Sequence, residues 1–264
     1  MPLTTIAKNY LDAKLTDQQR TALVKFQALR FRGLQHFIWR ALFGSNLNVL
    51  ATIYNSDKWN RHWYTQHYQR HFAPLRRKRL HLLEIGVGGY DDPELGGGSL
   101  RMWRTYFPQA QIYAIDIVDK QAHDERRIKT FKGSQTDEEF LSRVVDEMGT
   151  IDIIIDDGSH QNDHVLKSFH FLFPRLADGG IYVVEDTQTS YWNSYGGSSV
   201  EMSQPYTTMG FLKSLADGVN YEEFDRPDYQ PTYLDKHIVA LHFYHNLVFV
   251  QKGRNEEGSN RLLT

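Results

Sequence analysis

The chain has 264 residues, a formal net charge of −2 and no cysteine. The near-neutral charge gives no general attraction to nucleic acid or to an anionic membrane, so the expected partner is small or neutral. The lack of cysteine excludes disulfides, thiolate catalysis and cysteine-bound zinc. The length and a hydrophobic content of 41% favour one α/β domain with a helical extension over two small domains.

The sequence shows neither a signal peptide nor a membrane-spanning segment. The first 20 residues lack the basic-then-apolar build of a signal peptide, and no uninterrupted apolar run reaches about 18 residues. We therefore expect a soluble, cytoplasmic protein. The sequence leaves its oligomeric state open, a homo-oligomer included.

Residues 1–79 are predicted to form a helical extension. Thr16–Gln19 can cap a helix with a basic outer face, which suits a docking helix better than a membrane-surface helix. Residues 54–79 are rich in aromatic and histidine side chains, which either form a wall over a ligand or pack on a sheet. His67 and His71 have the i, i+4 spacing of metal ligands, but no acidic ligand lies near them, so we expect no metal there.

From Leu80 onward, apolar strands alternate with helical segments, which is typical of a parallel sheet. The expected strands are 80–85, 112–117, 127–132, 151–155 and 181–184, and the expected helices are 99–107, 137–148 and 163–176. Segments 237–244 and 247–250 flank His245-Asn246 and resemble an antiparallel hairpin at the sheet edge. The predicted fold is an α/β, Rossmann-like, mostly parallel sheet in a domain at 80–254, followed by a tail at 255–264.

The first predicted strand ends in a glycine turn, LLEIGVGGY at residues 82–90. Gly86, Gly88 and Gly89 allow the backbone to approach a bound ligand closely. Asp91 occupies the place of the third glycine of a dinucleotide fingerprint, and the chain has no P-loop motif, so NAD and a phosphate cradle are disfavoured. A ligand with adenosine but no phosphate fits better, and S-adenosylmethionine is such a ligand.

Asp116 ends the second predicted strand, beside the glycine turn. An acidic residue in this place accepts hydrogen bonds from ribose hydroxyls, although a backbone-capping carboxylate is the alternative. We expect the donor to be surrounded by four residues at the ends of the first two strands: Glu84, Gly86, Gly88 and Asp116. Three residues of the following loops complete the predicted donor set: Ser99, Gln135 and Asp137.

Two acidic pairs, Asp156-Asp157 and Glu185-Asp186, follow successive predicted strands. In a parallel sheet they emerge at the same edge, where their charges repel one another unless a cation is present. Oxygen ligands select Mg²⁺, Mn²⁺ or Ca²⁺. His160 follows Asp157 by three residues and could deprotonate a hydroxyl polarised by that cation. In the alternative interpretation, the acidic residues form a turn and a helix cap, and His160 is a structural hydrogen-bond donor.

Several segments resemble the class I, metal-dependent sugar O-methyltransferases of antibiotic pathways, which act on macrolide deoxysugars and on noviose. They include SDKWNRHWY, GGGSLRMWRTYFP and IDDGSHQNDHVLKSFHFLFPRLADGGIYVVEDTQTSYW, and the similarity covers about residues 50–254. This resemblance implies S-adenosylmethionine as methyl donor and a divalent ion, Mg²⁺ or Mn²⁺, bound by Asp157, Glu185 and Asp186. It also implies His160 as the base.

The predicted function is methyl transfer to a sugar hydroxyl of a glycosylated small molecule. A hydroxylase-like enzyme on the same scaffold is one alternative, although it would need two histidines and one carboxylate that converge. A catalytically inactive binding protein is another, against which the intact acidic and histidine set argues. We expect segments 54–68 and 187–210 to close over the acceptor through four aromatic residues: Trp63, Tyr64, Tyr191 and Trp192.

Overall fold

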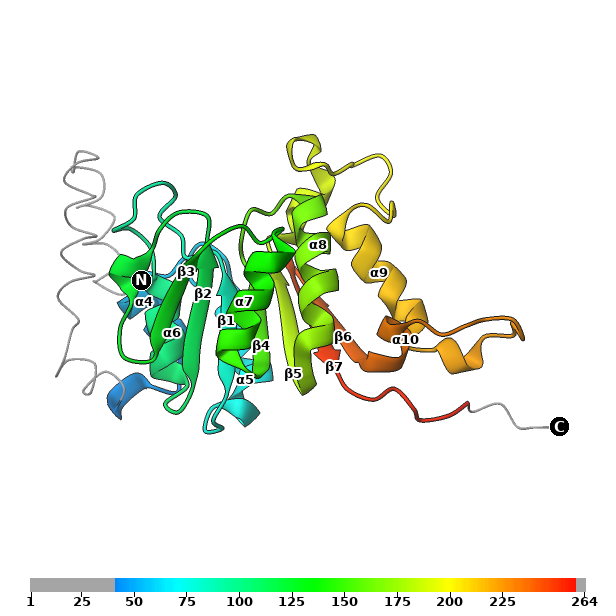
Figure 1. Ribbon diagram of the computed structural model, residues 1–264, viewed down its shortest axis with the longest axis horizontal. Coiled ribbons are helices and arrows are strands. Elements are labelled where there is room, and N and C mark those ends of the chain that lie inside the picture. The colour runs from blue at the N-terminus through cyan, green and yellow to red at the C-terminus, as the bar shows by residue number, and fades with distance from the viewer. Residues whose placement is uncertain (1–40, 260–264) are drawn as a thin grey trace.

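The structure is a computed structural model in which residues 41–259 are described. The helix predicted from Thr16 onward lies almost entirely outside these residues. The described part contains a seven-stranded sheet with helices on both faces (Figure 1). None of its helices has the length and apolar character that a membrane crossing requires.

The sheet has the strand order β3-β2-β1-β4-β5-β7-β6. Its strands are β1 (His81–Ile85), β2 (Gln111–Asp116), β3 (Ile128–Lys132), β4 (Ile151–Asp156), β5 (Leu176–Glu185), β6 (Ile238–Tyr244) and β7 (Leu247–Lys252). Strands β1 to β5 are parallel, and β7 pairs antiparallel with both β5 and β6. The predicted Rossmann-like sheet with an antiparallel C-terminal hairpin is confirmed.

The α-helices are α4 (Leu47–Ile53), α5 (Thr65–Phe72), α6 (Gly98–Tyr106), α7 (Glu138–Met148), α8 (Asn162–Leu172), α9 (Thr208–Gly218) and α10 (Tyr233–His237). Short 3-10 turns are η1 (Ala73–Leu75), η2 (Gln121–His123), η3 (Phe173–Arg175), η4 (Thr187–Tyr191), η5 (Asn193–Tyr195) and η6 (Tyr221–Glu223). The helix predicted to reach residue 176 ends at Leu172, because Pro174 lacks an amide hydrogen and the chain continues as η3.

Side chains of the central strand β4 alternate between two hydrophobic cores. Ile153 and Ile155 belong to the core built with α4, α5 and α6, whereas Ile154 belongs to the core built with α7, α8 and α9. All three are fully buried, which explains the continuous β-branched run in the sequence. At about 25 cal/mol per Å² of apolar surface, such burial supplies the main driving force that holds the strand ends in place.

Strand β5 begins five residues earlier than predicted. Asp178-Gly179-Gly180 has the composition of a turn, but it lies within β5 next to a register shift against β4. Gly179 has a positive φ of 78°, which glycine tolerates without steric cost, so the irregularity fits inside the strand.

The aromatic segment before β1 packs mainly on the sheet. Tyr68 and Phe72 of α5 are fully buried, and His71 stacks on Phe249 of β7 with ring centroids 4.3 Å apart. Helices α4 and α5 therefore share a core with the strands. The domain boundaries expected at residues 79 and 254 stay predictions.

Candidate functional site

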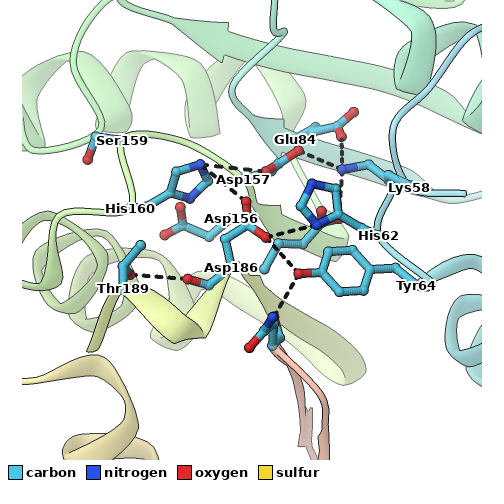
Figure 2. Close-up of polar contacts among 12 residues, drawn as sticks. Lys58, His62, Tyr64, Glu84, Asp156, Asp157, Ser159, His160, Asp186 and Thr189 are labelled. Carbon is cyan, nitrogen blue, oxygen red and sulfur yellow. Dashed lines mark hydrogen bonds and ion pairs between the residues drawn. The ribbon is translucent and has the colours of Figure 1, made fainter. Parts of the chain in front are cut away.

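The acidic residues predicted to converge do lie at one edge of the sheet. Neighbouring strands β1, β4 and β5 end there, and their register sets Ile85 beside Asp156 and Asp156 beside Val184. Figure 2 shows the resulting cluster, with Glu84, Asp157 and Asp186 directed toward a common space. The geometry follows from parallel pairing, since the carboxyl ends of parallel strands meet at the same edge.

A cation from the chain itself lies inside this cluster. The Lys58 ammonium is 2.6 Å from Asp157 Oδ2, 2.7 Å from Glu185 Oε1 and 3.3 Å from Glu84 Oε1 (Figure 2). Its side chain is only 1% exposed. Sequence reasoning required a cation at this place but missed Lys58, which lies within the SDKWNRHWY segment 99 residues before Asp157.

The shared environment changes the acid–base properties of these groups. Burial raises the pKa of Glu84 to about 7, and burial together with the charge of Asp157 raises the pKa of Glu185 well above its usual range. Burial alone would lower the pKa of Lys58. The three surrounding carboxylates outweigh it and hold the Lys58 pKa well above the usual value, so the ammonium stays charged.

Asp186 occupies the opposite side of the cluster. The Tyr64 hydroxyl lies 2.6 Å from Asp186 Oδ1 and 3.2 Å from the Asn246 carbonyl oxygen at the β6–β7 turn. His62 Nδ1 is 3.5 Å from the same carboxylate (Figure 2). Burial raises the pKa of Asp186, but the Tyr64 hydrogen bond and the neighbouring histidines outweigh burial and lower it. Asp186 therefore remains ionised.

His160 faces the carboxylates of Asp157 and Asp186. Its Nε2 atom is 3.7 Å from Asp186 Oδ2 and 4.0 Å from Asp157 Oδ1, and its positive φ of 57° turns the side chain back over the end of β4. His164, the next histidine along the chain and the other candidate base, has its Nδ1 atom 2.9 Å from Ser159 Oγ and its Nε2 atom 4.0 Å from Asp163. The arrangement therefore directs His160, and not His164, toward the carboxylates.

The donor atoms fit a hard divalent ion. In the described part of the chain, the group able to hold a metal is Asp157, His160 and Asp186, with ligand atoms within 4.8 Å of one another. Carboxylate oxygens of this kind suit Mg²⁺ or Mn²⁺. Glu185, also expected as a ligand, is not in that group because its Oε1 is held by Lys58 and by the Tyr68 hydroxyl.

The glycine turn after β1 leaves room for a ligand. Gly86 has a φ of 93°, and a Cβ there would collide with the carbonyl oxygen of Asp157, so the turn packs directly on the end of β4. Gly88 has a φ of 76°, and the nearest atom to a Cβ would be Gly96 Cα at 3.9 Å. A Cβ at Gly88 would therefore meet no clash, so this face of the turn is not packed as tightly as the face at Gly86.

Asp116 caps backbone groups in this structure. Its two carboxylate oxygens each accept a hydrogen bond of 2.9 Å, from Val87 N and from Val118 N. This is the capping role that the sequence left as the alternative, and it also fixes the glycine turn against β2. The side chain is half-buried, so lone pairs remain, and a contact with ribose stays a prediction.

The other predicted donor residues have structural partners as well. Glu84 is fully buried and accepts hydrogen bonds from Ser99 Oγ at 2.9 Å and Trp103 Nε1 at 3.2 Å. Gln135 accepts from Ser159 N at 2.9 Å, and Asp137 is the exposed N-cap of α7. Direct contacts of these residues with a ligand stay predictions.

Comparison with known proteins identifies the family to which the chain belongs. A family model described as a methyltransferase domain matches residues 33–187. The chain belongs to this methyltransferase family. It is 50% identical to mycinamicin VI 2''-O-methyltransferase of Micromonospora griseorubida over 215 residues, which is 81% of this chain and 54% of that protein. It is 47% identical to demethylmacrocin O-methyltransferase of Streptomyces fradiae, with the same two coverages.

A solved structure supports the same relationship. The MycE methyltransferase from the mycinamycin biosynthetic pathway, in complex with Mg, SAH and mycinamycin VI, superposes with a TM-score of 0.79 at 48% identity. The match covers 83% of this chain and 56% of that chain. The chain thus spans about half the length of the relatives that it matches. The resemblance to antibiotic sugar O-methyltransferases inferred from the motifs is confirmed.

In this member of the methyltransferase family, residues 187–210 form the second of the two segments that the sequence predicts to close over the acceptor. This segment begins with two 3-10 turns, η4 and η5. Asn162, at the start of α8, donates to the carbonyl oxygens of Thr189 and Tyr195 and accepts from the amide of Thr208 at 2.7 Å. Sequence reasoning missed this buried asparagine, which ties the segment to the end of β4. Residues 200–206 are mostly exposed, and Val200 is 90% exposed.

Proposed function

We propose that the chain transfers a methyl group from S-adenosylmethionine to a sugar hydroxyl of a glycosylated natural product. The observation that carries the proposal is the position of His160, which faces Asp157 and Asp186 beside an open glycine turn. The names of the relatives support methyl transfer over a hydroxylase-like or inactive protein.

The two cosubstrate sites are proposed as follows. Asp157 and Asp186, with Glu185 as the third proposed ligand, would hold a divalent cation, which makes a nearby hydroxyl more acidic when bound. Gly86, Gly88 and Asp116 are proposed to contact S-adenosylmethionine, the source of the electrophilic methyl group. Glu84, Ser99, Gln135 and Asp137 complete the proposed donor set, and the first three support the strand ends from the buried side.

His160 is the proposed general base. A neutral imidazole nitrogen that faces the acceptor hydroxyl takes its proton as the oxygen attacks the methyl carbon. The bond between that carbon and the sulfonium sulfur breaks, its electron pair stays on sulfur, and S-adenosylhomocysteine leaves. Proton removal of this kind contributes about 10²–10⁴ in rate. Tyr64 acts as a positioning residue, because its hydroxyl fixes Asp186 Oδ1 and leaves Oδ2 toward His160. The expected sugar contact of Tyr64 is therefore replaced by a contact with a proposed metal ligand.

Exposed aromatic rings beside the cluster suit a glycoside. Trp63 is 55% exposed and Trp192 is 48% exposed, and they belong to the two segments predicted to close over the acceptor. Aromatic rings of this kind pack against the apolar faces of sugars and of large apolar aglycones. Trp63 is itself held edge-to-face against Trp59, with centroids 4.7 Å apart.

The direct test is mass spectrometry of candidate glycosides incubated with the protein, S-adenosylmethionine and Mg²⁺. Mycinamicin VI and demethylmacrocin, which the relatives' names suggest, are the first acceptors to try. We expect a gain of one methyl group that EDTA abolishes and Mg²⁺ restores. Methyl transfer that persists in chelator would refute the metal role. If the protein binds S-adenosylmethionine but methylates none of the glycosides, the proposal of a sugar acceptor is refuted.

A further inference from the structure

We propose that Lys58 is the chain's own counter-cation for the buried carboxylates at this sheet edge, and that it competes with a divalent cation for Asp157 and Glu185. In this role Lys58 is a positioning residue. The competition rests on the proposed function, whereas the counter-cation role rests only on the contacts of the protein itself.

The fold fixes the position of the Lys58 ammonium. The Lys58 carbonyl oxygen accepts hydrogen bonds from Tyr64 N at 3.1 Å and Thr65 N at 3.2 Å, so its backbone is joined to the start of α5. From there the side chain crosses the interior to contact Glu185, a residue 127 positions away in sequence. A surface lysine has no such constraint, so the internal ion pairs are a built feature of the fold.

The Lys58 ammonium offsets negative charge among the buried carboxyl groups. Glu84 and Glu185 are buried, and Asp157 is about three-quarters buried. Buried carboxylates without a partner are costly because they lose hydration and repel one another. One ammonium in contact with all three offsets part of that cost and keeps the strand ends of β1, β4 and β5 together.

Asp157 is the residue that Lys58 and a metal would share. Its Oδ2 contacts the ammonium, whereas its Oδ1 faces His160 and the side of the cluster occupied by Asp186. Glu185 is the other shared residue. Its Oε1 contacts Lys58, so a metal that bound Glu185 would compete with the ammonium for this carboxylate. Lys58 therefore lowers the negative charge available to a cation, and so lowers its affinity while it keeps the metal-free protein folded.

The test compares Lys58→Met with Lys129→Met, a matched control that removes a half-exposed lysine paired with Glu147 at the surface. In EDTA, the melting temperature should fall by more than about 6 °C for Lys58→Met and by less than about 3 °C for Lys129→Met. Calorimetric titration with Mg²⁺ should show at least about tenfold tighter binding to Lys58→Met than to the unmodified protein.

A second variant keeps the test decisive if Lys58→Met fails to fold in EDTA. The double variant Lys58→Met with Glu185→Gln also removes one of the buried carboxyl groups left without its lysine partner and should recover part of the lost stability. A double variant no more stable than Lys58→Met would overturn the counter-cation role, as would a Lys58→Met melting temperature equal to that of Lys129→Met.

The two halves of the proposal fail separately. If Lys58→Met binds Mg²⁺ no more tightly than the unmodified protein does, the proposed competition between Lys58 and the metal is overturned. Absence of Mg²⁺ binding to both proteins would overturn the competition and the proposed metal site together, while the melting temperatures in EDTA would still decide the counter-cation role.

Discussion

His71 should make the folded protein less stable as pH falls below neutrality. Its ring packs on Phe249 and its Nε2 lies 2.9 Å from the Tyr244 hydroxyl. Burial, together with the nearby positive charges of His242 and Arg70, lowers the pKa of His71 from 6.5 to about 4. His71 therefore binds a proton less readily in the folded state than in the unfolded chain. As a result, the free energy of unfolding decreases as pH falls from 6.5 through about 4.

The size of this loss follows from the two pKa values. Between pH 7 and pH 5, a group with pKa 6.5 unfolded and about 4 folded would remove about 1.8 kcal/mol of unfolding free energy. His71 is partly solvated, and screening reduces this figure to about 1 kcal/mol. With a urea m-value of about 2 kcal/mol/M, the midpoint attributable to His71 should shift by about 0.5 M.

Urea unfolding of His71→Phe at both pH values measures this contribution. Phenylalanine keeps the stacking on Phe249 but does not titrate, so the variant should lose about 0.5 M less between pH 7 and pH 5 than the unmodified protein. Tyr244→Phe is the control, because it removes the same hydrogen bond and leaves the imidazole in place. An equal loss with pH in His71→Phe and the unmodified protein would refute the reasoning.

Three further outcomes test the site. His160→Ala should lower kcat by at least about 100-fold with donor affinity unchanged, whereas His164→Ala should have little effect; the reverse result in steady-state kinetics would reassign the base. Gly88→Ala should weaken S-adenosylmethionine binding at least about tenfold in calorimetry while it costs only about 1–2 kcal/mol of stability, and unchanged affinity would contradict the proposed cradle. A protease that cleaves after Glu201 should cut within 200–206 and slow at least about twofold when donor and acceptor are present; equal rates would argue against closure of this segment.

Local patterns were sufficient to predict most of the sheet. The β-branched run of β4 and the glycines after β1 identify a buried strand and a tight turn within a few residues, and parallel pairing then brings Asp157 and Asp186 together. Asp137 shows the limit of such patterns, because an acidic residue that begins a helix serves equally well as a cap or as a ligand contact, and here it caps α7.

The partners of the site come from distant segments and could not be predicted from the sequence alone. Lys58 lies in a polar, aromatic stretch where a lysine normally belongs to the solvated surface, and nothing near it in sequence indicates three carboxylates 26 to 127 residues away. Asn162 likewise has no distinctive local pattern. Its role depends on backbone groups of a segment that folds back from residues 189–208.

The contact between Tyr64 and the Asn246 carbonyl has a consequence for the order in which the proposed active site assembles. These residues are 182 positions apart, and the Asn246 carbonyl also accepts from Thr187 N directly after Asp186. During synthesis from the N-terminus, Asp157, His160 and Asp186 leave the ribosome well before residue 246. This edge of the sheet therefore stays incomplete until the C-terminal hairpin has emerged and β7 has inserted between β5 and β6. A nascent chain halted before that point should carry the acidic cluster without its final geometry.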